Sequence, residues 1–250
     1  VRIAADDVAG QHPIITELPQ PRGAVTALAL DALLENLYVG TADGQVVHVA
    51  LSETESPEMR AAYTVAASST AVTTLGFLSG DRSLVVMSED GAVSTWGLVR
   101  RADAPSGWKL TQIHTFRPHN APVTAFAPSQ RVKGFVTGDR KGNLFLHHAT
   151  SSQTLLRLAN SEFPIRAVAF APKGDGLIAL DGAGQLSLYQ VQNAYPEVTL
   201  ETLFAKVWYE GYDQPAHVWQ SSSGSDDVEP KLGLLPLAFG TLKGTMYALF

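Results

Sequence analysis

The sequence has no cysteine, little charge and no basic run. Without cysteine the chain has no disulfide bond, no thiolate zinc site and no cysteine nucleophile. Charged residues are 17% of the 250 residues, and 24 acidic against 18 basic side chains give a net charge of −6. An acidic chain without a basic block has no electrostatic footprint for nucleic acid or an anionic lipid surface, so both classes of ligand are excluded.

The two ends lack the usual terminal signals. The first residue is Val1, and no basic region followed by an apolar run comes after it, as a signal peptide would have. The last residues stop inside an apolar stretch. We expect a longer parent polypeptide, although a processed N-terminus would look the same.

The middle of the chain contains an internal repeat. Four stretches align without gaps, and each has a Val or Ile followed 19 residues later by a glycine. The four pairs are Val25 and Gly44, Val72 and Gly91, Val123 and Gly142, and Ile165 and Gly184. The units recur after 47, 51 and 42 residues, so insertions fall between units and not within them.

Each unit predicts three strands, of which the second and third are joined by a tight glycine turn. Candidates for a fourth strand lie at 61–67, 108–116, 153–159 and 198–209, with 13–19 as the equivalent strand before the first unit. Four strands in every 42 to 51 residues is the period of a propeller blade. The prediction is an all-β chain, a β-propeller with four recognisable four-stranded blades. Because sheets avoid open edges, we expect it to be the C-terminal part of a larger propeller.

The third unit carries the resemblance to a known family. "RPHNAPVTAFAPSQRVKGFVTGDRKGNLFLHH" resembles a WD repeat, with His119 in the place of that family's Gly-His. The repeats depart from the family at its signature Trp position, which holds Val49, Trp96, His147 and Tyr189, and the next residue is never Asp. The resemblance implies a WD-like β-propeller. The hydrogen-bond network of WD blades is not implied, because only one unit has the histidine.

Histidines are the first candidates for metal ligands. His147 and His148 are neighbours on a predicted third strand, so their side chains point to opposite faces and cannot both bind one metal without help from elsewhere. Packing within the blade is the preferred interpretation of this pair over metal binding. His114 and His119 flank a loop, and surface or blade packing is preferred for them as well.

The other candidate motifs also favour structural roles. No nucleophile motif is present, and the glycines of 78–83 and 138–143 join strand to strand, whereas a phosphate loop leads into a helix. The turn aspartates lack the dense carboxylate series of a calcium loop; they are Asp43, Asp90, Asp139 and Asp181. The basic loop residues are interpreted as solvated charges in preference to an anion site; they are Arg22, Arg82, Arg131, Lys133, Arg140 and Lys141. We predict no enzyme, no catalytic, cofactor-binding or metal-binding residue, and no cofactor.

The chain divides into three regions: propeller blades over 1–210, an aromatic and then Ser/Gly/Asp-rich linker over 211–231, and the start of a transmembrane segment over 232–250. Aromatic residues before an apolar segment suit the membrane interface, although they suit a closing strand equally. As a helix, 232–250 would extend about 28 Å, close to the ~30 Å of a bilayer core. Lys243 would be costly facing lipid, so we expect a helix that begins near residue 240 and continues past 250.

The tail carries a second resemblance. "EPKLGLLPLAFGTLKGT" (229–245), within the last 44 residues, is similar to the junction in large phosphate ABC transporter permeases that carry a propeller-like insertion between their first two membrane spans. This implies the periplasmic domain of an inner-membrane permease subunit in a bacterial phosphate importer. The implied partners are a periplasmic phosphate-binding protein, a second permease subunit, the ATPase subunit and the membrane itself. The residues that pass phosphate would lie beyond Phe250. The alternative is a free-standing WD-like protein-interaction scaffold.

Overall fold

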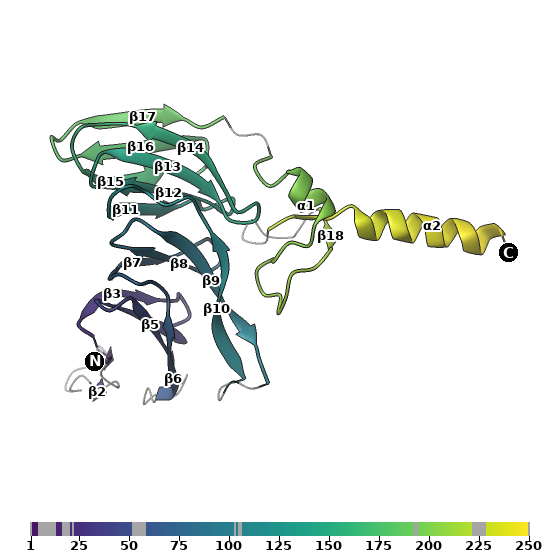
Figure 1. The fold of residues 1–250 in the computed structure, drawn as a ribbon, viewed down its shortest axis with the longest axis horizontal. Helices are drawn as coiled ribbons and strands as arrows, with labels where there is room; N and C mark the ends of the chain where they lie inside the picture. Colours follow the sequence, from purple (N-terminus) through teal and green to yellow (C-terminus); the bar gives the residue numbers. More distant parts are fainter. Residues whose placement is uncertain are drawn as a thin grey trace, which may run out of the picture.

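The computed structural model describes residues 2–4, 14–16, 21, 23–51, 59–102, 104, 107–192, 195–221 and 229–249. Most regular structure in these parts of the chain is antiparallel sheet, and each sheet is built from strands that follow one another in sequence. Figure 1 shows the sheets succeeding one another in chain order, with a long C-terminal helix leading away from them. The predicted all-β propeller class is confirmed.

Three blades have four strands each. The first contains β3 (Val25–Leu30), β4 (Asn36–Thr41), β5 (Gln45–Leu51) and β6 (Met59–Ala66). The second contains β7 (Val72–Phe77), β8 (Ser83–Ser88), β9 (Val93–Arg100) and β10 (Trp108–Thr115). The third contains β11 (Val123–Pro128), β12 (Gly134–Asp139), β13 (Asn143–His148) and β14 (Gln153–Ala159). The fourth strands predicted for these blades are confirmed.

In the described part of the chain, the last blade has three strands, β15 (Ile165–Phe170), β16 (Gly176–Asp181) and β17 (Leu186–Gln190). The fourth strand predicted over 198–209 is wrong, because this region forms the short helix α1 (Leu200–Phe204). Thr199 and Thr202 make a capping box in which each side chain accepts a hydrogen bond from the other's backbone N–H. This local pattern satisfies the first helical turn and starts a helix where apolar alternation indicated a strand.

A two-stranded sheet precedes the first blade. It pairs β1 (Arg2–Ala4) with β2 (Ile14–Thr16) in antiparallel register. The strand predicted over 13–19 is confirmed for 14–16, and its remaining residues lie outside the described part of the chain.

Contacts between neighbouring blades explain the Val/Ile-Thr pair with which a repeat unit begins. The hydroxyl of Thr26 on β3 donates to the carbonyl of Val72, the first residue of β7. Thr124 on β11 repeats this contact with the carbonyl of Ile165 on β15, at 2.6 Å. A Cβ atom added at Gly138 would lie 2.4 Å from the Ile165 side chain, so a glycine there allows the third and fourth blades to approach closely. The Val/Ile-Thr start of a unit therefore belongs to the blade interface.

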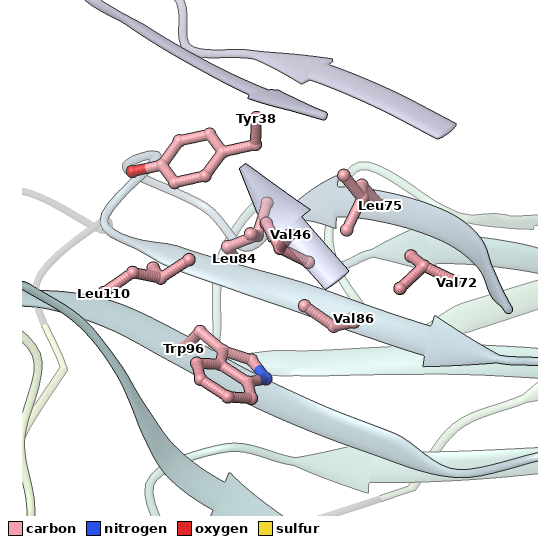
Figure 2. Packing of buried hydrophobic residues seen from close by; sticks show 8 residues of the cluster. All are labelled: Tyr38, Val46, Val72, Leu75, Leu84, Val86, Trp96 and Leu110. Carbon is pink, nitrogen blue, oxygen red and sulfur yellow. The ribbon is translucent and has the colours of Figure 1, made fainter. Parts of the chain in front are cut away.

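The apolar core lies between neighbouring blades. Figure 2 shows the cluster between the first two, in which Tyr38 and Val46 from the first blade face Leu75, Leu84 and other side chains of the second. The outward faces of the terminal blades are different. Leu28 on the first blade is 63% exposed and Leu188 on the last is 74% exposed. Burial of apolar surface in the described structure thus comes mainly from blade-on-blade stacking.

The C-terminal tail contains β18 (Trp219–Gln220), which pairs with β19 (Lys231–Leu232), and α2 (Leu235–Leu249). The helix begins at Leu235 and not near residue 240 as predicted. Pro236 is accommodated because a first-turn residue needs no backbone N–H donor. None of the helices in the parts of the chain that the structure describes is long and apolar enough to cross a membrane.

Candidate functional site

The tail docks onto the loops of the second and third blades through a buried ion pair. The Nζ atom of Lys133, just before β12, lies 2.6 Å from Oε2 of Glu210, and both side chains are almost fully buried. Lys133 also donates to the carbonyl of Ser79. The Ser83 hydroxyl, at the start of β8, donates to the other Glu210 oxygen at 2.6 Å. Lys133 was interpreted from the sequence as a solvated loop charge, and this is wrong because a distant tail residue covers it.

The side chain of Glu229 adds a second contact between the tail and the third blade. Glu229 accepts hydrogen bonds from the hydroxyl of Thr150 and from the backbone N–H of Glu210, both at 2.5 Å. Burial, and then the nearby charge of Glu210, raise the pKa of Glu229 to about 7. We name Lys133, Glu210, Glu229 and Thr150 the latch, because they join two separate parts of the tail to the third blade.

The tail also contacts the second blade. His114 on β10 lies 3.1 Å from the carbonyl of Trp208 and 2.5 Å from the hydroxyl of Ser152. Burial lowers the pKa of His114 to about 4, so this histidine is neutral at physiological pH. The backbone N–H of Arg100 donates to the carboxylate of Asp213 at 2.8 Å. Packing was the preferred interpretation of His114, and here it connects a blade to the tail.

A cavity of about 740 Å³ lies between the tail and the first two blades. Aromatic side chains form much of its wall: Tyr38, Trp108, Trp208, Tyr209 and Tyr212. The lining residues with ionisable acidic or guanidinium side chains are Glu35, Asp81, Arg82, Glu210 and Glu229. Two latch residues, Glu210 and Glu229, therefore also line the cavity. Its wall combines aromatic rings with more acidic than basic side chains.

The third blade contains a buried hydrogen-bond network. His119 lies 2.9 Å from Asp139 through Nδ1 and 2.7 Å from the Thr137 hydroxyl through Nε2. The Thr137 hydroxyl lies 2.9 Å from Nε2 of His147, and Nδ1 of His147 lies 3.0 Å from the hydroxyl of Thr154. The sequence alone does not imply a hydrogen-bond network of the WD type in any blade. The third blade contains such a network, with His147 at the position where WD repeats carry Trp.

The proton positions in this network follow from the donors available. If Thr154 donates to His147, His147 donates to Thr137, Thr137 donates to His119 and His119 donates to Asp139, every group is paired. That order requires both histidines to be neutral. Burial lowers the pKa of His119, and it lowers the pKa of His147 to about 3. With both histidines neutral, the network is fully paired and lies buried within the blade.

The remaining candidates have structural or solvent-exposed positions. His148 is buried next to Ser151. In the last blade Asp181 accepts hydrogen bonds from the backbone N–H groups of Ala183 and Gln185, which shapes its hairpin turn. Four of the predicted basic residues are exposed: Arg82, Arg131, Arg140 and Lys141. Arg22 lies outside the described residues. Within the described ranges no group of three or more His, Asp or Glu side chains is arranged to hold a metal ion.

Sequence reasoning missed the latch. Glu210 directly precedes the predicted linker over 211–231 and Glu229 lies within it, and no local pattern connects either of them to a lysine in the third blade. Residues 222–228 of this linker lie outside the described residues. The one available signal was a lysine directly before a predicted strand, which is an ordinary loop feature.

Comparison with known proteins supports the fold alone. No protein-family profile and no curated protein matches the sequence. The computationally designed Ika4 protein superposes with a TM-score of 0.55 at 19% identity, over 70% of this chain and 96% of its own. The computationally designed Ika8 protein gives 0.54 at 20% identity, over 70% of this chain and 48% of its own. The β-propeller domain of Myceliophteria thermophila Cps50 (Swd1) gives 0.55 at 18% identity, over 67% and 51%. The chain thus spans about half the length of two of these propellers.

Proposed function

We propose that the chain is a non-catalytic protein-interaction scaffold, and more specifically the extracytoplasmic propeller domain of a permease subunit in a phosphate ABC importer. The WD-like propeller fold fits an interaction domain. The permease assignment depends on the resemblance of 229–245 to the junction that leads from such an insertion into the membrane core.

One structural observation supports this assignment most directly. Helix α2 has no buried residue, although it carries Leu237, Phe239, Leu242 and other large apolar side chains. Figure 1 shows it projecting away from the blades. A helix with such exposed apolar surface needs a partner outside the described structure, because water is a poor solvent for it. A membrane or further membrane helices would supply that partner.

The latch gives the second supporting argument. It holds the tail on both sides of 222–228 against the blades, directly before α2 begins. In a permease subunit, this contact would fix the orientation of the propeller relative to the membrane. The propeller would then present its surface to the periplasmic phosphate-binding protein in a defined way, whereas a freely swinging domain would not.

A binding measurement with matched arms tests the proposal. The immobilised 250-residue chain is exposed to the phosphate-binding protein of the same organism, with and without phosphate, and to an unrelated periplasmic binding protein. We expect binding to the phosphate-binding protein alone. Absence of binding in both phosphate conditions, together with a coding sequence that stops soon after Phe250, would favour the free-standing WD-like scaffold.

A further inference from the structure

The aromatic cavity has no role in the function proposed above. At about 740 Å³ it falls within the ~300–1,000 Å³ of typical small-ligand sites. Its walls come from the first blade, the second blade and the tail, together with Ala149 of the third blade. The latch and the contacts of His114 hold the tail in place, so the cavity is formed before any ligand arrives.

The rings in its wall suit a positive charge. Trp108 is 41% exposed, and Trp208 and Tyr212 are half-buried. The indole N–H of Trp208 donates to the carbonyl of Tyr212 at 2.8 Å, which fixes the orientation of that ring. The faces of such rings carry negative electrostatic potential and attract ammonium and guanidinium groups within about 6 Å of the ring centre.

Two contacts within the chain show this attraction at the same rings. The guanidinium carbon of Arg100 lies 5.2 Å from the centre of the Trp108 ring. The Nζ atom of Lys231 lies 5.7 Å from the centre of the Tyr212 ring. Neither cation is among the described residues that line the cavity.

The charged side chains of the cavity wall also favour a positively charged ligand. Among the described residues, the cavity is lined by four acidic side chains and by one guanidinium group, that of Arg82. One of the four, Glu229, has its pKa raised to about 7 and so carries only part of a negative charge at neutral pH. Lys133 compensates Glu210 from behind the wall. Burial lowers the pKa of His48 and of His114 to about 4, so neither histidine adds positive charge. The excess of negative charge disfavours phosphate and other anions.

We propose that this cavity binds an organic cation, an ammonium or guanidinium group carried on an apolar frame. The rings contact the frame and the face of the cation, while the carboxylate of Asp81 supplies the opposite charge. The cation can belong to a free amine or to a basic side chain of a peptide. This proposal does not depend on the permease assignment.

Calorimetric titration of the full 250-residue chain tests the proposal. The probes are choline for the ammonium group and agmatine for the guanidinium group. The control probes are 3,3-dimethylbutanol, the neutral analogue of choline, and inorganic phosphate. We expect both cations to bind at least tenfold more tightly than the neutral analogue, and phosphate not to bind. A short peptide with one arginine between apolar residues then identifies the source, since tighter binding than agmatine indicates a protein ligand and equal or weaker binding a free amine.

Matched variants locate the site. Trp108→Leu and Asp81→Asn should each weaken choline binding about three- to tenfold, because each removes one attractive group. Asn tolerates the positive φ of 53° at Asp81, so the backbone conformation is kept. Trp219→Leu and Glu162→Gln change an exposed ring and an exposed charge outside the cavity, and they should leave the affinity unchanged.

Several outcomes would overturn the proposal. Equal affinity for choline and its neutral analogue would show that charge has no part in recognition. Phosphate binding that displaces choline would assign the site to anions. Equal effects of the cavity variants and their controls would place any cation elsewhere on the protein.

Discussion

The ammonium group of Lys133 lies 2.6 Å from the carboxylate of Glu210, and this contact connects the third blade to the tail that leads into α2. Because both side chains are almost fully buried, each depends on the other to offset its loss of hydration.

Replacing the cation should therefore be costly. We expect Lys133→Met to lower the free energy of unfolding by about 3–5 kcal/mol, since it leaves Glu210 buried without its counter-ion beside Glu229. Urea unfolding followed by tryptophan fluorescence measures the change. Lys141→Met, which removes an exposed lysine of the same blade, is the control and should change the stability by less than about 0.5 kcal/mol. Similar losses in the two variants would contradict the burial of the ion pair.

The double variant Lys133→Met/Glu210→Gln tests the pairing itself. With no charge left at either position, it should be more stable than Lys133→Met alone, because the uncompensated carboxylate is gone. The same unfolding measurement applies. A double variant that loses the sum of the two single effects would show that the residues do not interact.

Glu229 should make stability depend on pH. Its pKa is raised from 4.5 to about 7 in the folded state, so the folded protein holds this proton more tightly than the unfolded chain. Its contribution to stability is thus fully present below pH 4.5 and is lost as the pH rises through 7. In Glu229→Gln this titration is absent, so the stability of the native protein relative to the variant should fall by about 1–3 kcal/mol between pH 5 and pH 8. Glu162→Gln, at an exposed site, should show no such trend.

The network in the third blade predicts unequal effects for two turn aspartates. Asp139 is fully buried and accepts hydrogen bonds from His119, from the backbone of Lys141 and from the backbone and side chain of Asn143. We expect Asp139→Ala to cost about 3 kcal/mol or more, because several donors lose their acceptor at once. Asp43→Ala, in the exposed turn of the first blade, should cost less than about 1 kcal/mol. Equal costs in thermal unfolding would contradict the network.

The hairpin glycines provide a geometric test. Gly142 and Gly184 both have positive φ, 81° and 84°, so alanine is strained at either position. A Cβ atom at Gly142 would also lie 1.9 Å from the carbonyl oxygen of Ser161, whereas at Gly184 it would meet nothing within 4 Å. Gly142→Ala should therefore be the more destabilising by at least about 1–2 kcal/mol, as measured by the shift in melting temperature. Equal shifts would mean that the loop of Ser161 does not pack on this turn.

Much of the fold could be predicted from the sequence. The constant spacing between the first Val or Ile of a unit and its turn glycine fixed the three strands of each blade, because strand length and hairpin geometry are local properties. The fourth strands of the first three blades were predicted from apolar alternation. The same signal failed over 198–209, where the capping pair of Thr199 and Thr202 begins a helix.

The sequence by itself determined the blade, its repeat and the absence of thiol chemistry, since each depends on composition or on neighbours along the chain. The tertiary structure decided everything that needs two distant segments to meet. It paired Lys133 with Glu210, raised the pKa of Glu229 through burial, and brought Trp108 and Trp208 together in the wall of one cavity. The physical reason is that burial and charge compensation depend on what covers a side chain, and in this protein the covering residues lie far away in sequence.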